Sequence, residues 1–370
     1  MSHPPRILFL SGNAPPAIDG VGDYTDRLLE ELKRQRPEWQ WCWLSRLPRW
    51  FSSPFTKRQG VPLFRPIRMW NACGLALGAI RALNPQVLHV QEELYSFHET
   101  DAALRIARSA NAFLVTTLHE FHSDHPKVDQ TSELVDISDC VIANDPRTAT
   151  RCLKATGRGV DRTLWSGATV LPPCPADRPA TIPGLVVTFG FLSTLKSLEV
   201  VHDALKTARI SRSDIRWRII GPFEPETNPR HAALRDRFAA DSAWIELVGA
   251  VNDHAKLRRL IAEAQAMLLP FADGASTRRG TLQIAWAFGL PVVTTPPNEP
   301  IEAVRAGENV LIAIEPEDWR HGVLSLLGEQ NLAERLRRGG LESAKQFSWQ
   351  RLAEKHLEIY DELLETDHIH

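Results

Sequence analysis

Short apolar runs alternate with stretches of helical periodicity along almost the whole chain, and this alternation starts again near the middle. In the first half, a helical pattern covers 22–35, and the predicted strands are 6–12, 86–91, 113–119, 139–145 and 169–173. In the second half, helical patterns at 197–209, 231–240, 253–264 and 279–289 alternate with predicted strands at 185–190, 217–221, 244–249, 266–271 and 290–295. Strands that alternate with helices form parallel sheets covered on both faces. The sequence therefore predicts an α/β protein with two such sheets.

The segment 172–184 separates the two halves, because it holds five prolines and shows no periodicity. A chain of 370 residues has room for two domains at roughly 100–200 residues each. We expect an N-terminal Rossmann-like domain over 1–175 and a C-terminal one over 176–346. Ligands of open parallel sheets bind at the carboxyl ends of the strands, so two facing sheets place the ligand in the cleft between them.

Composition excludes several classes of protein. The net charge of −2 gives no reason to expect nucleic-acid binding. No apolar run reaches the length of about 18 residues that a membrane-spanning helix needs, and the start of the chain lacks a signal-peptide pattern. The five cysteines are scattered without metal-binding spacing, which is typical of reduced thiols in the cytoplasm. A cytoplasmic enzyme without a bound metal or other cofactor is the expectation.

The first candidate site is the turn Asp19, Gly20, Val21 and Gly22, between the first predicted strand and the first helix. Glycines let a ligand approach the backbone, and the N–H groups at a helix start attract phosphate or hydroxyl oxygens. The spacing is not the G-x-G-x-x-G of dinucleotide-binding proteins. A plain tight turn remains the alternative.

The second candidate is His119, at the end of a predicted strand. A histidine at this position can bind a sugar hydroxyl or assist proton transfer, although a structural role is the alternative. His122, Asp124 and His125 follow on a loop, but their spacing matches no metal-ligand signature.

The third candidate is the helix start after the predicted strand 266–271, which carries Arg278, Arg279, Gly280 and Thr281. Two guanidinium groups, a hydroxyl and free backbone N–H groups suit a diphosphate. Lys196, from the loop after the first strand of the second half, adds a further positive charge. A solvated basic helix start is the alternative.

With these residues the chain resembles the large family of retaining GT-B glycosyltransferases, family 4-like or group 1, that build bacterial polysaccharides and glycolipids. The resemblance rests on 266–312 as a donor-binding region, on 19–25 as a glycine loop, on 86–93 and 118–123 as sugar-site segments, and on 347–364 as a closing helix. It implies two Rossmann-like domains facing across a cleft, with 347–370 crossing back to the first domain. It also implies a nucleotide-diphosphate sugar as substrate, a polysaccharide or lipid-linked acceptor, and no obligatory metal. Catalysis is assigned to His119 and Arg279. The residues expected to bind the donor are Gly20, Val21, Gly22, Lys196, Arg278, Arg279, Gly280 and Thr281.

The chain departs from the family pattern at four positions. The usual pair of glutamates falls on Ser276 and Ile284, and neither residue supplies a carboxylate. The family arginine after the first strand of the C-terminal domain falls on Phe191, and a family glycine falls on Ser197. We expect Arg278 and Arg279 to replace the lost charge. A catalytically degenerate subunit that binds a nucleotide sugar or a partner transferase, and a different GT-B enzyme such as an epimerase, remain alternatives.

The stretch 39–91 contains no acidic residue, seven basic residues and five of the eleven tryptophans. Cations with amphipathic aromatic rings suit an anionic membrane surface or a phosphate on the acceptor. This pattern predicts peripheral attachment to the inner face of the cytoplasmic membrane. The alternative is that Trp41 and Trp43 alternate in a strand and pack in the core.

Overall fold

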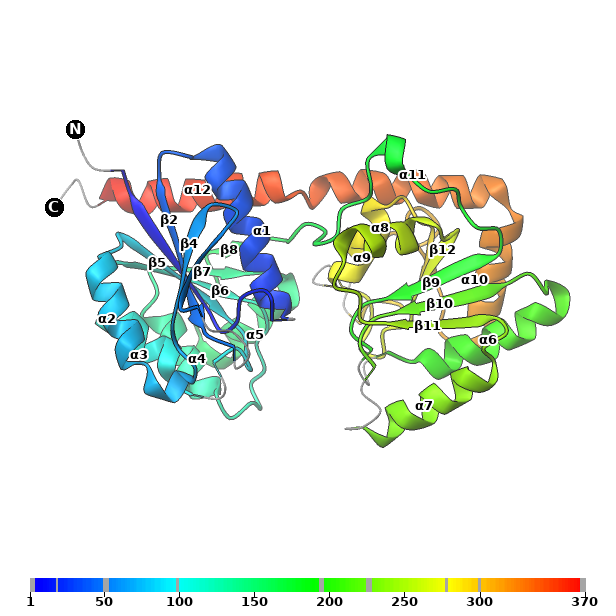
Figure 1. Ribbon diagram of the computed structural model, residues 1–370, viewed down its shortest axis with the longest axis horizontal. Coiled ribbons are helices and arrows are strands. Elements are labelled where there is room, and N and C mark those ends of the chain that lie inside the picture. Colours follow the sequence, from blue (N-terminus) through cyan, green and yellow to red (C-terminus); the bar gives the residue numbers. More distant parts are fainter. Residues whose placement is uncertain are drawn as a thin grey trace. The chain divides into compact units, whose positions relative to one another are not determined.

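The structure is a computed structural model that describes residues 4–17, 19–48, 53–97, 100–192, 196–223, 228–276, 279–298 and 301–366. The chain forms two compact units. The first comprises Met1–Ser166 and Ser348–His370, and the second comprises Gly167–Phe347. Each unit holds its own sheet (Figure 1). The division falls at Ser166, before the proline-rich segment, whereas the sequence suggested residue 175.

The first unit is built on an eight-stranded sheet of order β3-β4-β2-β1-β5-β6-β7-β8. Only the β3–β4 pair is antiparallel. Its strands are β1 (Arg6–Ser11), β2 (Gln40–Arg46), β3 (Phe55–Arg58), β4 (Val61–Ile67), β5 (Val87–Glu92), β6 (Phe113–Leu118), β7 (Cys140–Ala143) and β8 (Arg162–Thr163). Its helices are α1 (Gly20–Gln35), α2 (Gly74–Leu83), α3 (Ala102–Ser109), α4 (Val128–Asp136), α5 (Pro146–Thr156) and α12 (Trp349–Thr366), with a 3₁₀ turn at Trp70–Ala72.

Both faces of this sheet are covered, because β1 is apolar on both sides. Ile7 and Phe9 belong to a buried cluster with residues of α1 and α12. The alternating residues Leu8 and Leu10 belong to a second cluster with residues of α2 and α3. Successive side chains of a strand point to opposite faces, so a strand buried on both sides is a continuous apolar run. The closing helix α12 thus contributes to the core of the first unit.

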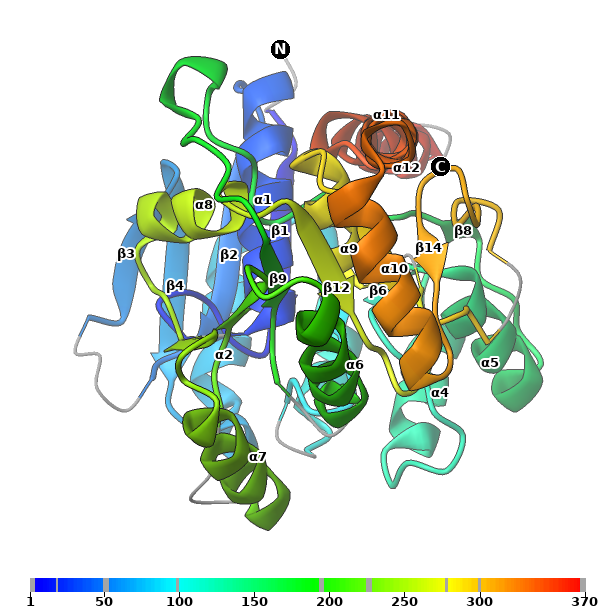
Figure 2. The same cartoon turned by 90° about the vertical axis from the view of Figure 1, so that its right-hand side faces the viewer.

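The second unit is built on a six-stranded parallel sheet of order β11-β10-β9-β12-β13-β14. Its strands are β9 (Leu185–Phe189), β10 (Arg216–Ile220), β11 (Ile245–Gly249), β12 (Ala266–Leu269), β13 (Val292–Thr294) and β14 (Leu311–Ile312). Its helices are α6 (Leu198–Ser211), α7 (Pro229–Ala240), α8 (His254–Ala262), α9 (Gly280–Ala287), α10 (Pro316–Gly328) and α11 (Gln330–Gln346), with a 3₁₀ turn at Pro175–Asp177. Figure 2 shows α6 and α10 in front of this sheet.

The strand order reverses once in each sheet. In the first unit β2 and β5 flank β1, and in the second β10 and β12 flank β9. The connecting loops leave in opposite directions on the two sides of such a point, and a crevice opens at the carboxyl ends of the strands. These two edges are where ligand-binding residues are expected.

The five strands predicted between residues 185 and 295 are all present, as β9 to β13, whereas the predictions for the rest of the chain failed in part. The predicted strand 169–173 is wrong, because this segment is irregular and includes Pro172 and Pro173, which lack the N–H that a strand pairs. Strands β3, β4, β8 and β14 were not predicted. Strand β2 was foreseen only as the packed alternative for Trp41 and Trp43.

Candidate functional site

The carboxyl ends of β9 and β12 bring together the loop after β9 and the start of α9. Gly190 follows β9 with a φ of +111°. A Cβ at this position would lie 2.6 Å from the Cγ2 of Thr281 and 3.0 Å from the Nζ of Lys196. Only glycine fits so close to both side chains, so the loop that holds Gly190 and Lys196 meets Thr281 of α9 here.

Lys196 is buried at this edge, with 5% of its surface exposed. Its Nζ donates a hydrogen bond of 2.7 Å to the carbonyl oxygen of Phe189. Its backbone forms an isolated antiparallel bridge with Phe271, after β12. Burial, and secondarily the charge of Arg279, lower the pKa of Lys196 to about 7. A buried amine whose pKa lies near neutral pH is typical of a site that binds an anion.

Arg279 immediately precedes α9 and is held from two directions. It forms an ion pair with Asp273, and its guanidinium carbon lies 5.0 Å from the centre of the Phe271 ring. Gly280 is the first residue of α9, and Thr281 is in its first turn. The predicted neighbour Arg278 lies outside the described residues. A fixed guanidinium at a helix start, where backbone N–H groups lack helical partners, is suited to phosphate oxygens.

The two positions of the missing glutamates are buried and carry no carboxylate. Ile284 packs inside α9 with 2% of its surface exposed. Ser276 is 8% exposed, and its Oγ has no hydrogen-bond partner within the described residues. Phe191, at the family's arginine position, is exposed. The positive charge of this edge therefore comes from Lys196 and Arg279 among the residues described.

In the first unit, the predicted glycine loop lies between β1 and α1. Asp19 caps α1, and its Oδ1 accepts a hydrogen bond of 2.6 Å from the backbone N–H of Gly22. A Cβ on Gly22 would lie 3.1 Å from the carbonyl oxygen of Asn13, whereas one on Gly20 would meet nothing within 4 Å. Val21 is buried. The cap already occupies the N–H of Gly22, so this helix start offers less to a ligand than the sequence suggested.

His119 follows β6 and is buried with both ring nitrogens engaged. Its Nε2 lies 2.9 Å from the Oε1 of Gln91, and its Nδ1 lies 3.4 Å from the Nδ2 of Asn144. The amide partners define the tautomer: Nε2 donates and Nδ1 accepts. Burial, and secondarily His356, lower the pKa of His119 to about 3. This ring is neutral at physiological pH, which suits hydrogen bonding better than proton transfer.

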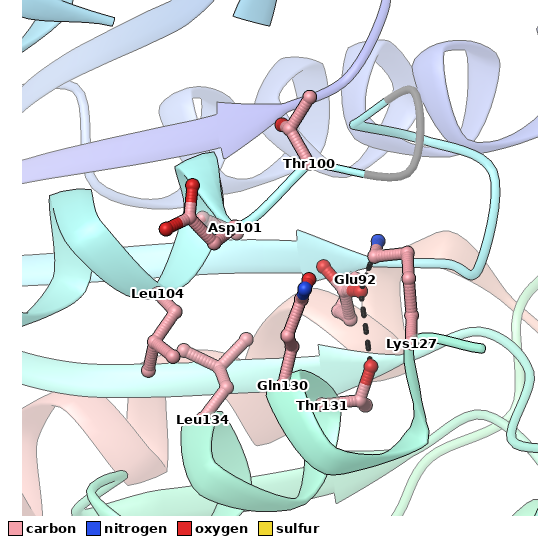
Figure 3. Close-up of a pocket in the computed structure, with 9 residues that line it drawn as sticks. Glu92, Thr100, Asp101, Leu104, Lys127, Gln130, Thr131 and Leu134 are labelled. Atoms are coloured by element: carbon pink, nitrogen blue, oxygen red, sulfur yellow. Dashed lines mark hydrogen bonds and ion pairs between the residues drawn. The ribbon is translucent and has the colours of Figure 1, made fainter. Parts of the chain in front are cut away.

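A buried ion pair that the sequence did not predict lies at the carboxyl edge of the first unit's sheet. Glu92 ends β5, and its Oε1 accepts from the Nζ of Lys127 at 3.1 Å and from the Oγ1 of Thr131 at 3.4 Å (Figure 3). Both charged side chains are almost fully buried. They line a cavity of about 10 Å³, the size of one water molecule, together with Thr100, Gln130 and other residues. Burial raises the pKa of Glu92, and the charge of Lys127 opposes that shift. The sequence offered no signal for this pair, because the partners are 35 residues apart.

The tryptophans of 39–91 are largely core residues. Trp41, Trp43 and Trp70 are buried, and their indole N–H groups donate to the carbonyl oxygen of Arg36, the Oγ of Ser11 and the carbonyl oxygen of Gly12. Trp39 is partly buried and stacks on Trp41. Trp50 lies outside the described residues. The packed alternative is therefore right for the three buried rings, and they are not available to a membrane surface.

No helix in the part of the chain that the structure describes is long and apolar enough to cross a membrane. No group of three or more His, Cys, Asp or Glu side chains among the residues placed by the structure is arranged to hold a metal ion.

Part of the chain matches a known family. Residues 183–329, which form most of the second unit, match the model of the family "Glycosyl transferases group 1". No curated protein matches the chain at the sequence level.

Three solved structures share the fold over nearly the whole chain. Sucrose-phosphate synthase from Thermosynechococcus elongatus superposes with a TM-score of 0.77 and 15% identity, over 98% of this chain and 100% of that one. Alr3699/HepE from Anabaena, in complex with UDP and glucose, gives 0.71 and 16%, over 96% and 99%. The UDP-forming α,α-trehalose-phosphate synthase from Burkholderia xenovorans, in complex with glucose-6-phosphate, gives 0.71 and 12%, over 95% and 99%. The fold is that of GT-B glycosyltransferases, with two parallel-sheet α/β domains.

Proposed function

We propose that this protein is a glycosyltransferase that moves a sugar from a nucleotide-diphosphate donor to a saccharide or lipid-linked acceptor. The observation that carries the proposal is the meeting of buried Lys196 and Arg279 with the start of α9, at the carboxyl ends of β9 and β12. The match of residues 183–329 to the glycosyltransferase family supports it.

The chemistry follows from where charge develops. When the bond between the anomeric carbon and the diphosphate breaks, negative charge grows on the departing phosphate oxygen. The Lys196 ammonium, the Arg279 guanidinium and the N–H groups of Gly280 and Thr281 stabilise that charge without reorganising. We propose that Arg278, outside the described residues, adds a second guanidinium. Because these cations belong to the protein, the proposal needs no metal ion.

In the first unit we propose that Gly20, Val21 and Gly22 contact the donor, and that the same edge, which also carries His119, binds the acceptor. His119 is a donor and acceptor of hydrogen bonds to Gln91 and Asn144, and we assign it to positioning around the transferred sugar. Retention of anomeric configuration is proposed from the family resemblance alone. We further propose a role in cell-envelope or exopolysaccharide synthesis in the cytoplasm.

Peripheral attachment to an anionic membrane is a separate part of the proposal. Three of the indole rings are buried, so the aromatic residues no longer support membrane attachment. The exposed basic residues Lys57, Arg68 and Arg81 still support it. Each basic residue near an anionic surface contributes on the order of 1 kcal/mol. Co-sedimentation with phosphatidylglycerol vesicles at low salt checks it; no binding there would leave a soluble acceptor.

One observation favours a second function. The glutamate positions hold Ser276 and Ile284, so a subunit that binds a nucleotide sugar without transferring it is the alternative.

Calorimetry with UDP, GDP and ADP tests the donor site, and donor turnover then separates the two functions. Binding with turnover supports the transferase, and binding without turnover supports the subunit. A chain that binds none of the three nucleotides would contradict both.

A further inference from the structure

Arg46 is a half-buried basic side chain of the first unit that forms no ion pair with any residue the structure describes. It ends β2, which pairs directly with β1. Its Nε donates a hydrogen bond of 2.6 Å to the Oδ1 of Asn13, and within the described residues its side chain makes no other hydrogen bond or ion pair. Its side chain is half-buried, and burial lowers its pKa although Asp19 opposes that shift. The terminal nitrogens are therefore left with donors to spare.

The neighbouring arginines differ, because both are committed to the protein. Arg58 forms an ion pair of 2.5 Å with Asp26. Arg65 is almost fully buried and donates to the carbonyl oxygen of Pro15 at 2.6 Å and to the Oγ1 of Thr56 at 2.8 Å. Their positions are explained by packing and pairing. Arg46, by contrast, makes a single side-chain hydrogen bond among the described residues, to Asn13, so packing and pairing do not account for its position.

The hydrogen bonds around Arg46 also fix the orientation of its guanidinium group. Asn13 accepts from Arg46 and donates to the Oδ2 of Asp19 at 2.9 Å. The other oxygen of Asp19 accepts from Gly22. A relay of three hydrogen bonds thus joins the guanidinium to the glycine loop and occupies both oxygens of Asp19. A guanidinium held through one edge keeps its outer donors in the fork that binds phosphate through two parallel bonds.

We propose that Arg46 binds a phosphate group carried by the acceptor, at the carboxyl edge of the first sheet beside the glycine loop. This inference rests on the proposed function and names the chemical class of its acceptor. The phosphate comes either from a soluble sugar phosphate or from a lipid headgroup.

Binding of glucose 6-phosphate, glucose and inorganic phosphate to the full chain tests the site by calorimetry. We expect glucose 6-phosphate to bind and glucose to bind far more weakly. Arg46→Gln keeps an amide donor for Asn13 but removes the fork, and should weaken glucose 6-phosphate binding at least about tenfold. Arg46→Lys keeps the charge and should lose less. Lys154→Gln is the control, because Lys154 is an exposed base of α5 outside the acid-free stretch.

Vesicles distinguish the two sources of phosphate. If Arg46→Gln lowers binding to phosphatidylglycerol vesicles and Lys154→Gln does not, while glucose 6-phosphate does not bind, the phosphate belongs to a lipid. If neither ligand responds to Arg46, the inference is overturned. UDP binding is measured on the same samples. If UDP still binds, only the inference about Arg46 fails. If the wild type does not bind UDP, the proposed function fails as well. An unchanged melting temperature of Arg46→Gln shows that the loop still folds.

Discussion

The Nζ of Lys196 and the carbonyl oxygen of Phe189 are 2.7 Å apart, so a buried amine is tied to the last residue of β9. Because the pKa of this amine is lowered to about 7, roughly half the molecules carry it uncharged at neutral pH. A bound diphosphate favours the ammonium form. Nucleotide binding should therefore take up a proton, and UDP affinity should fall as the pH rises from about 7 to 9. Calorimetry in buffers of different ionisation enthalpy measures the uptake.

Lys196→Met provides the control for this effect. In the wild type the unfolded state binds more protons between the folded pKa of about 7 and the ordinary value of 10.5, so its stability should rise with pH across that window relative to Lys196→Met. Below about pH 7 both states are protonated, and the full cost of burying the charge is present. An equal pH slope for the two proteins, together with pH-independent UDP binding, would show that Lys196 is an ordinary surface base.

Arg279→Ala should weaken nucleotide-diphosphate binding by about 1.5–3 kcal/mol, the contribution of a hydrogen bond to a charged group. The reason is the fixed guanidinium between Asp273 and Phe271, at the start of α9. Arg337→Ala is the control, because Arg337 pairs with Glu334 on the surface of α11. Calorimetry with UDP and GDP measures both variants. Equal affinities in Arg279→Ala and the wild type would remove this residue from the donor site.

Gly190→Ala should lower both stability and UDP affinity. Alanine is strained at a φ of +111°, and its Cβ would overlap the Cγ2 of Thr281 at 2.6 Å. We expect a loss of about 1–3 kcal/mol in unfolding free energy. Gly328→Ala, at the end of α10 with nothing within 4 Å, should change stability by less than about 0.5 kcal/mol. Urea unfolding gives both values. Similar midpoints for the two variants would mean that the loop after β9 can move away from α9.

The fold could be predicted from the sequence where burial is two-sided. Strands such as β9 and β12 are continuous apolar runs between helical patterns, and their type follows directly from this periodicity. Strand β4 was not predicted, because Pro62, Arg65 and Pro66 interrupt its apolar pattern. The burial of Arg65 there depends on the carbonyl oxygen of Pro15, which no local rule reveals.

The sequence predicted which residues belong to the candidate site, but not which residues they contact. Lys196 and Arg279 were chosen for their charge near strand ends, and the parallel topology places both at one edge. The roles of Asp273 as the partner of Arg279 and of Asn13 as the partner of Arg46 depend on loop conformations. Residue type and periodicity do not predict such contacts, because they depend on how each loop is bent.

His119→Ala should lower turnover more than donor affinity, because His119 lies in the first unit, whereas the cations assigned to the diphosphate, Lys196 and Arg279, lie in the second. With its pKa near 3, the ring cannot titrate between pH 5 and 8. The pH–rate profile of His119→Ala should therefore keep the shape of the wild-type profile over that range. Gln91→Ala removes the partner of Nε2 and should show the same pattern more weakly. Loss of a titration between pH 5 and 8 in either variant would instead make His119 a proton donor or acceptor.

The first unit should be sensitive to mild acid because of His356, which is buried in α12. Its Nδ1 donates to the carbonyl oxygen of Leu352 at 2.8 Å, and its ring stacks on that of His89. Burial lowers the pKa of His356 to about 4 and that of His89 well below its ordinary value. Between the ordinary value of 6.5 and about 4, the unfolded chain binds protons that the folded chain does not. Stability should therefore fall as the pH drops through that range, by at most about 1.4 kcal/mol per pH unit for each histidine.

His356→Leu should reduce that slope by the share of one proton, whereas His321→Leu should not, since His321 is exposed. Urea unfolding at pH 7, 6, 5 and 4.5 measures the slopes. Leucine fills the buried site without a group to protonate, although it also gives up the bond to Leu352, so its stability at pH 7 is the reference for each variant. If His356→Leu retains the wild-type slope, the ring is already protonated in the folded state at these pH values. The acid sensitivity would then arise from carboxylates of surface ion pairs, and added salt would reduce it.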